Sequence, residues 1–196
     1  MVSRRMNSLG FGARRRGGEV TVRGAKKTYV IQTMSGREAR VKALIEKIVG
    51  PELVSECFIP TFVVRKRYGD EIRLKEKKLT PGYLYVVSPD IDAASRALRD
   101  VPAFTRLLSQ DDRFIPLESA DMAWIERLTR PNERVIGMST GVIEHDNVIV
   151  QSGPLKGLEG WIRKIDRHKC LAFLEVRILG RTKTIGVGIE IVRRTD

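Results

Sequence analysis

The stretch from Gly153 to His168, GPLKGLEGWIRKIDRH, constrains the fold of this chain more than any other segment. Its glycines stand where a chain must turn sharply or bring its backbone close to another surface, and Pro154 stiffens the corner between them. After this turn, apolar residues such as Trp161 and Ile165 can point inward while the cations beside them remain available to phosphate. The segment therefore predicts a barrel loop that faces RNA.

The last third of the chain is strand-like throughout. Four strands are expected, at Val148–Gln151, Gly160–Ile165, Leu171–Leu179 and Lys183–Val192. Four or five short strands in so few residues suit a small closed barrel, because closure removes the exposed edges of an open sheet.

The first two thirds of the ordered sequence, from Thr28 onward, mix strands and helices. Apolar spacing predicts three helices, over Arg37–Val49, about Asp90–Asp100 and about Glu118–Leu128. Strand-like runs surround them, in a β-α-β-β-β-α-β-α order with a charged hairpin centred on Tyr68-Gly69-Asp70. This order indicates an α+β domain, an antiparallel sheet with helices against it.

The segment Thr129–Thr140 lacks periodicity and contains Pro131, Asn132, Gly137 and Ser139. We expect it to be a linker between a first domain at 28–128 and a second at 141–196.

The net charge of +12 suggests a polyanionic partner, but the excess is uneven, with +7 in residues 1–27, +2 in 28–139 and +3 in 140–196. The leader 1–27 repeats Gly and Arg without periodicity, so we expect it to be disordered. It could bind nucleic acid loosely through Arg14, Arg15 and Arg16, or resemble a transit peptide, or be a solvated tail.

The leader has no apolar core of a secretory signal, and the sequence has no stretch long enough to cross a bilayer. We expect a cytoplasmic, monomeric protein without a membrane partner. Cys57 and Cys170 stand far apart without metal-ligand spacing, and both are expected to be reduced thiols.

The region 28–196 resembles the NusG family of transcription elongation factors. The first half is similar at TYVIQTMSGRE (28–38), CFIPTFVV (57–64), KKLTPGYLYV (77–86) and VPAFTRLL (101–108). The second half resembles the KOW motif at DNVIVQSGPLKGLEGWIRKID (146–166). Within the family, residues 139–175 most resemble the LoaP branch of specialised paralogues.

The resemblance implies an amino-terminal NGN domain, an antiparallel sheet flanked by helices, followed by a small SH3-like β-barrel KOW domain. The NGN domain would bind the coiled coil of the RNA polymerase largest subunit through an apolar pocket. The KOW domain would contact a ribosomal protein or Rho in the general factor. In LoaP-like proteins it would contact a structured leader RNA, a nascent hairpin, with processive antitermination as the outcome.

The polymerase pocket carries over by this resemblance onto seven residues: Tyr29, Phe58, Pro60, Leu79, Thr80, Pro81 and Tyr83. Aromatic and proline side chains suit such a contact because they offer rigid area at little rotamer cost. The family usually has an aromatic residue where this chain has Thr80, which predicts a shallower or shifted pocket. An ordinary sheet core explains Phe58 and Leu79 equally well, and it is favoured for Tyr83.

The candidate RNA-binding residues are cations clustered around two turns of the second domain, with two more as a second shelf. They are Lys156, Arg163, Lys164, Arg167, His168 and Lys169, with Arg181 and Lys183 as the shelf. Strand alternation predicts that Arg163 and Lys164 point to opposite faces. Taken singly, each cation is explained equally well as a solvated surface residue.

An enzyme is not indicated, because the sequence has no Ser/His/Asp order, phosphate-binding loop or zinc spacing. We expect no cofactor and no metal. Two alternatives stay open: a general NusG factor whose barrel binds protein, and a ribosome-type KOW module that binds RNA without contacting polymerase.

Overall fold

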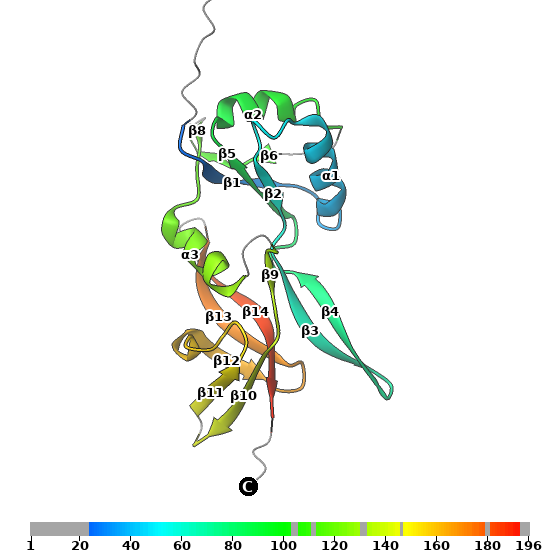
Figure 1. Ribbon diagram of the computed structural model, residues 1–196, viewed down its shortest axis with the longest axis vertical. Helices are drawn as coiled ribbons and strands as arrows, with labels where there is room; N and C mark the ends of the chain where they lie inside the picture. The colour runs from blue at the N-terminus through cyan, green and yellow to red at the C-terminus, as the bar shows by residue number, and fades with distance from the viewer. Residues whose placement is uncertain are drawn as a thin grey trace, which may run out of the picture.

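The computed structural model describes residues 24–102, 106–110, 113–129, 133–145, 147–178 and 181–192. Nearly all of the predicted leader, including Arg14, Arg15 and Arg16, lies outside these residues. The described chain forms an α+β unit at one end of an elongated molecule and a β-rich unit at the other (Figure 1).

The first unit is built on a four-stranded sheet with the order β2-β5-β1-β6. Its strands are β1 (Lys27–Gln32), β2 (Glu56–Phe58), β5 (Tyr83–Ser88) and β6 (Arg106–Leu107). All of its ladders are antiparallel, and the register sets Val30 opposite Tyr85. The predicted antiparallel sheet is therefore confirmed.

Two helices cover one face of this sheet, α1 (Glu38–Ile48) and α2 (Ile91–Leu98) (Figure 1). Helix α1 places Val41 and Ile45 in the core, one turn apart. Helix α2 begins where the Asp90 carboxylate accepts a hydrogen bond from the Ala93 N–H at 2.9 Å, an ordinary N-cap. Both helices were predicted, and each begins within a residue of its expected start.

A long hairpin, β3 (Thr61–Tyr68) and β4 (Glu71–Lys78), leaves this unit and projects beside the β-rich unit (Figure 1). It turns at Gly69, whose positive φ of 60° suits a residue without a Cβ. Strand β3 also pairs in parallel with a short strand, β9 (Val135–Ile136). Strand β9 lies within the segment 129–140 that the sequence indicated as a linker, so part of this segment is a short strand.

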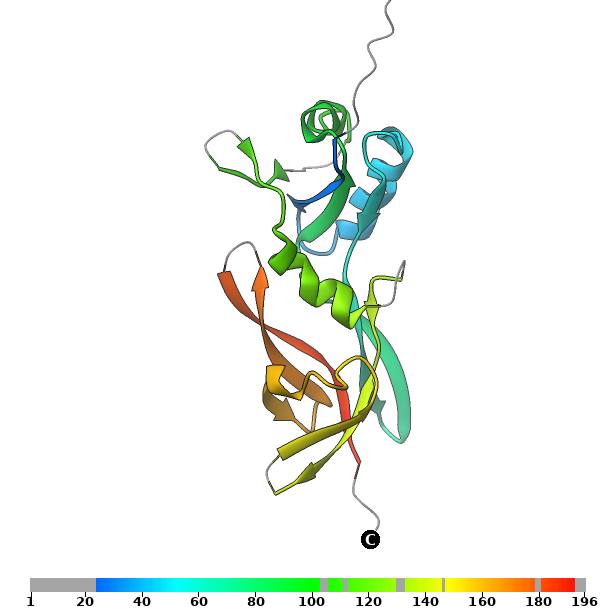
Figure 2. The same cartoon turned by 60° about the vertical axis from the view of Figure 1, so that its left-hand side comes forward.

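Helix α3 (Ser119–Leu128) follows a small hairpin, β7 (Ser109–Gln110) and β8 (Arg113–Phe114), that the sequence analysis did not predict. Figure 2 shows α3 lying between the first sheet and the β-rich unit. Its residues Trp124, Ile125 and Leu128 are buried, so this helix joins the two units.

The β-rich unit is a five-stranded curved sheet with the order β11-β10-β14-β13-β12. Its elements are β10 (Ser139–Glu144), β11 (Asn147–Ser152), the 3-10 helix η1 (Glu159–Trp161), β12 (Ile162–Asp166), β13 (Leu171–Ile178) and β14 (Arg181–Ile191). The sequence analysis did not predict β10. No ladder joins β11 to β12 within the described residues, so the barrel is open along this seam.

Tight backbone contacts explain some of the glycines in this unit. Gly153 has a φ of 93°, and a Cβ there would lie 2.5 Å from the Ser139 Cα, so both conformation and space require glycine. Gly157 also has a positive φ, whereas Gly160 lies in open space.

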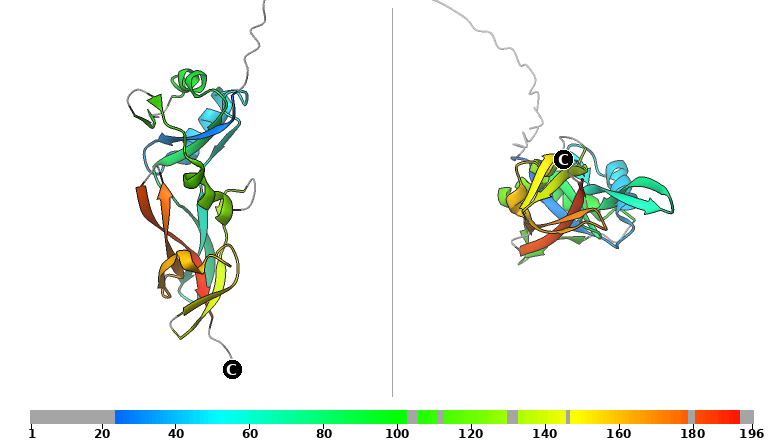
Figure 3. Two further views of the ribbon diagram at one scale, coloured as in Figure 1. Left: turned by 90° about the vertical axis from the view of Figure 1, so that its left-hand side faces the viewer. Right: turned by 90° about the horizontal axis from the view of Figure 1, so that it is seen from below.

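Apolar side chains form two clusters on opposite faces of the first sheet. One lies under α1 and α2 and includes Tyr29, Ile31 and Val86. The other begins at Val30, Phe58 and Tyr85, passes through α3 and continues into the β-rich unit. The second cluster is thus shared by the two units, and the barrel lies against the sheet (Figure 3).

Candidate functional site

Four of the seven predicted polymerase-contacting residues line one small cavity. They are Leu79, Thr80, Pro81 and Tyr83, from the loop before β5 and the start of that strand. The cavity has a volume of about 190 Å³, and Val30 and Tyr85 also line it. The loop therefore presents an apolar and aromatic wall, the type of surface that anchors a protein partner.

A buried carboxylate fixes this loop. The Glu38 side chain is fully buried and accepts hydrogen bonds from the Gly82 N–H at 2.6 Å and from the Lys78 ammonium at 2.5 Å. Burial by itself raises the pKa of Glu38, but these hydrogen bonds outweigh it and hold the pKa below its usual value. On the other side, the Thr33 N–H donates to the Gly82 carbonyl at 2.9 Å, so the loop is held at two points.

Tyr29 does not join this cavity. Successive residues of a strand point to opposite faces, so Val30 faces the cavity and Tyr29 packs under α1 and α2. The structure therefore separates Tyr29 from the other predicted residues, and its buried ring belongs to the helix-covered core.

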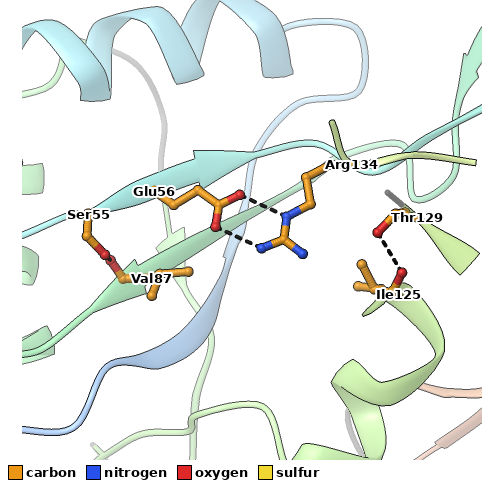
Figure 4. Close-up of polar contacts among 6 residues, drawn as sticks. All are labelled: Ser55, Glu56, Val87, Ile125, Thr129 and Arg134. Carbon is orange, nitrogen blue, oxygen red and sulfur yellow. Dashed lines mark hydrogen bonds and ion pairs between the residues drawn. The ribbon is translucent and has the colours of Figure 1, made fainter. Parts of the chain in front are cut away.

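Phe58 and Pro60 lie behind the cavity rather than on its wall. The Phe58 ring stacks on Tyr85 with centroids 5.2 Å apart, and the Arg134 guanidinium covers it at 4.4 Å. Figure 4 shows Arg134 donating two hydrogen bonds to Glu56, each 2.8 Å long. Pro60 is buried, and its carbonyl accepts the Leu79 N–H at 2.9 Å. Both residues thus support the pocket wall from below.

The opposite wall of the cavity comes from the β-rich unit. Lys183, Thr184 and Ile185 of β14 line it, and the Lys183 ammonium lies 5.8 Å from the centre of the Tyr83 ring. Lys183 was predicted as part of an RNA-binding shelf, and the structure places this exposed side chain beside the first sheet.

Side chains of α3 and β3 reinforce this contact between the units. The Trp124 indole N–H donates to the Arg177 carbonyl at 3.1 Å, and the Arg177 guanidinium lies 3.7 Å from the Asp121 carboxylate. Arg65 of β3 forms an ion pair with Glu190 of β14. The pocket wall is therefore covered in this conformation.

A second concave site lies at the open seam between β11 and β12. This basic groove has a volume of about 550 Å³ and brings together three predicted RNA-binding cations, Arg163, Lys164 and Arg167. Its remaining lining is apolar and polar: Ile143, Asn147, Val148, Glu159, Gly160, Ile162 and Ile165.

A bulge in β12 changes which face its cations occupy. Ile162 pairs with Leu174 and Lys164 with Phe173, so β12 holds one extra residue at Arg163. Arg163 and Lys164 consequently line the same groove. The expectation from strict alternation, which set these two side chains on opposite faces, is therefore corrected.

The remaining predicted RNA-binding residues lie outside the groove lining. Lys156 is exposed in the turn between Gly153 and Gly157, and His168 and Lys169 are exposed in the turn after β12. The Lys169 ammonium lies 3.5 Å from the Asp166 carboxylate, and Arg163 forms a hydrogen bond with Glu175 at 3.0 Å. Arg181 begins β14, at the end of the hairpin that carries Lys183 to the first sheet.

Glu38 and Arg134 are the residues of this site that the sequence analysis missed. Glu38 stands in a helix-start block and Arg134 in the predicted linker, where a charged residue ordinarily faces solvent. Their partners, Lys78, Gly82 and Glu56, are more than 30 residues away. Local pattern carries no signal for such contacts.

Within the described residues, no helix is long and apolar enough to cross a membrane. In the same part of the chain, no three His, Cys, Asp or Glu side chains are grouped to hold a metal ion.

Comparison with known proteins agrees with this architecture. The family model described as transcription termination factor nusG matches residues 26–126. The chain is similar to the transcription termination/antitermination protein NusG of Rickettsia bellii, 26% identical over 175 residues covering 87% of this chain and 91% of that protein. The Escherichia coli K12 protein of the same name is 26% identical, covering 86% and 96%.

Among solved structures, the chain is similar to one described as domain interaction in Thermotoga maritima NusG. The two share 25% identity with a TM-score of 0.52, covering 83% of this chain and 93% of the other. Because the family model spans more than half of the chain, the protein belongs to the NusG family of transcription termination and antitermination factors.

Proposed function

We propose that this protein binds RNA polymerase through residues 28–128, the NGN domain, and promotes processive antitermination while its KOW domain, residues 141–196, contacts a structured leader RNA. Residues 129–140 would connect the two domains, and the protein would act in the cytoplasm as a monomer. The observation that carries the proposal is the apolar pocket loop Leu79–Tyr83, hydrogen-bonded to the buried Glu38 in a chain of this family.

The shape and chemistry of the loop support the polymerase contact. An apolar helix face, such as one side of a coiled coil, would fit a wall made of Leu79, Pro81 and Tyr83. The hydrogen bonds from Lys78 and Gly82 to Glu38, which we call the Glu38 clamp, hold this wall before the partner arrives. This lowers the conformational entropy that the loop loses on binding. Because β14 forms the opposite wall, binding requires the β13–β14 hairpin to move away.

Polymerase binding is tested with a polar replacement in the wall, Tyr83→Asp. We expect purified core RNA polymerase to bind this variant at least about tenfold more weakly, since a charge would be buried in an apolar contact. Tyr68→Asp is the matched control, because Tyr68 is half-exposed at the tip of the β3–β4 hairpin. Equal binding of Tyr83→Asp and the parent chain would overturn the polymerase assignment.

The basic groove supports the RNA contact. Hairpin RNA is recognised through phosphates, 2′-hydroxyls and splayed loop bases, and arginine can both pair with phosphate and stack on a base. Arg163, Lys164 and Arg167 surround a floor that includes Ile162 and Ile165, so a base could insert between cations. The likeness of residues 139–175 to the LoaP branch supports the same assignment.

The RNA contact is tested by a gel shift with the leader transcript of the protein's own operon. Lys164→Gln with Arg167→Gln removes two groove cations, and we expect loss of the specific complex at about 0.15 M salt. Lys156→Gln with Arg181→Gln removes the same charge outside the groove lining and should leave the complex intact. If both double variants lose the specific complex, or both keep it, RNA binding is not localised at the groove.

A general NusG factor is the second candidate function, favoured by the names of the relatives reported above. In that case the KOW domain would bind a ribosomal protein or Rho. The leader transcript would then show only salt-sensitive retention without sequence preference, while polymerase binding would persist.

A further inference from the structure

The β3–β4 hairpin forms an arm whose charge the proposed function does not use. Between Arg65 and Lys78 the arm carries seven basic and three acidic side chains. Figure 3 shows it extending sideways from the barrel when the molecule is seen from below. Its outer part is exposed, from Arg67 at the end of β3 to Glu76 in β4.

The register of the hairpin sorts these charges onto two faces. Lys66 stands opposite Arg73, Val64 opposite Lys75 and Phe62 opposite Lys77. Residues opposite each other, and residues two apart along a strand, share a face of an antiparallel ribbon. Four cations therefore share one face, which we call the basic face of the arm: Lys66, Arg73, Lys75 and Lys77.

The two ends of the arm, its root at the first sheet and its tip at the turn, differ in how deeply this face is buried. At the root, Phe62 and Val64 are buried in the shared core, which anchors the ribbon. At the tip, Tyr68 is half-exposed on the same face as the cations. Because the arm is anchored in the core at one end, its tip can enter a groove of a ligand without any change in the packing of Phe62 and Val64.

The two faces also differ in how their charges are balanced. On the opposite face, Arg65 pairs with Glu190 and Lys78 with the buried Glu38. On the basic face, Arg73 is hydrogen-bonded to Glu71 at 2.9 Å. The side chains of Lys66, Lys75 and Lys77 form no hydrogen bond or ion pair with any residue that the structure describes.

The placement of Lys66 directly across from Arg73 is unfavourable in the free protein, because like charges in opposed positions repel. An anionic ligand lying across both strands would relieve this repulsion. Side chains two residues apart on a strand lie about 7 Å from each other, so one ribbon face offers several regularly spaced contacts.

We propose that the basic face of the β3–β4 arm binds the phosphate backbone of duplex DNA. A two-stranded ribbon fits the major groove of B-form DNA, whereas the deep and narrow major groove of A-form RNA excludes it. Lysine contributes point charge without base recognition, so the contact is independent of sequence. The arm is separate from the basic groove of the barrel, and DNA binding by the arm does not depend on polymerase binding.

The test measures binding of the full chain to a random-sequence DNA duplex across a series of salt concentrations. The arm variant carries Lys66→Gln, Lys75→Gln and Lys77→Gln. We expect its affinity near 0.1 M salt to fall by about tenfold or more, and the slope of log K against log salt to fall by nearly three. A control variant with Arg40→Gln, Lys47→Gln and Arg96→Gln loses the same charge from exposed positions of α1 and α2.

The control separates a located contact from general attraction between a basic chain and DNA. The proposal is supported if the arm variant alone loses affinity and slope, and it is overturned if both variants change equally or neither changes. Equal or tighter binding of a matching RNA duplex through the same lysines would overturn the assignment to DNA. Core polymerase without nucleic acid should bind the arm variant normally, so failure here is distinct from failure of the proposed function.

Discussion

The two faces of the first sheet are both covered, but by different parts of the chain. One face lies under α1 and α2, which follow the strands closely in sequence and bury Tyr29 and Ile31. The other face, which carries Tyr83 and Tyr85, lies under α3 and the β13–β14 hairpin, whose residues come up to about a hundred positions later. The first cover comes from helices near the strands in sequence, whereas the second comes from α3 together with the β13–β14 hairpin of the β-rich unit.

This difference bears on the proposed polymerase contact. A surface that must stay apolar for a partner is costly to expose to water in the free protein. Here the barrel shields it through contacts such as the hydrogen bond from the Trp124 indole N–H to the Arg177 carbonyl and the approach of the Lys183 ammonium to the Tyr83 ring. A partner that contacts Tyr83 must therefore compete with β14.

The largest expected effect comes from removing the tryptophan that joins the two units. Trp124 is 3% exposed, so Trp124→Ala should lower the free energy of unfolding by about 3–5 kcal/mol. Trp161 is only partly buried, and Trp161→Ala should cost less. Urea unfolding of both variants makes the comparison, and equal losses would contradict the central place of α3 in the shared core.

The Glu38 clamp should make stability depend on pH. The folded-state pKa of Glu38 is lowered from an unfolded value of about 4.3. Its contribution is therefore present above that value and is lost as the pH falls through the folded pKa.

We expect Glu38→Gln to cost about 1.5–3 kcal/mol at neutral pH, because it replaces hydrogen bonds to a buried charge. The difference from the parent chain should shrink as pH falls below about 4. Urea midpoints measured between neutral and acidic pH check this, and a difference that stays constant across the range would contradict the clamp.

A methyl group added at Gly188 should loosen the packing of the β-rich unit against the first unit. A Cβ at Gly188 of β14 would lie 2.1 Å from the Val63 carbonyl of β3, so the strands must separate. Gly188→Ala should lower stability by about 1–3 kcal/mol and strengthen polymerase binding. Gly160→Ala meets open space and serves as the control. Unchanged binding of both variants to polymerase would show that β14 does not compete.

The smallest effect is expected at the partly exposed ion pair between Arg65 and Glu190. A double-mutant cycle with alanine at both positions should give a coupling of about 0.2–1 kcal/mol, because solvent screens the pair. A coupling well above this range would mean that this ion pair, rather than apolar contact, holds the units together.

Features that depend on nearby residues were predictable from the sequence. Helix α2 begins at its Asp90 cap, and Gly153 with Pro154 indicated a turn where the structure gives Gly153 a positive φ. The α+β class followed from the succession of strands and helices along the chain, which is local information.

Features that depend on distant partners were not predictable. The pairing of β3 with β9 joins residues more than 70 positions apart, and the bulge at Arg163 appears only in the register with β13. The burial of both sheet faces was also hidden, because alternation shows that a residue is apolar but not which element covers it. The sequence analysis grouped four residues that line one cavity in the structure. It did not select Glu38, and it assigned Lys183, which lines the same cavity, to RNA binding.

The most direct test of the polymerase assignment follows the two indole N–H signals by NMR, since the chain has two tryptophans. The Trp124 N–H is hydrogen-bonded across the units to the Arg177 carbonyl, and the Trp161 ring lies 5.9 Å from the Arg127 guanidinium of α3. When a coiled-coil fragment of the RNA polymerase largest subunit is bound at saturation, we predict that hydrogen exchange at the Trp124 N–H accelerates relative to the free protein. Saturated binding with Trp124 still protected would contradict the account.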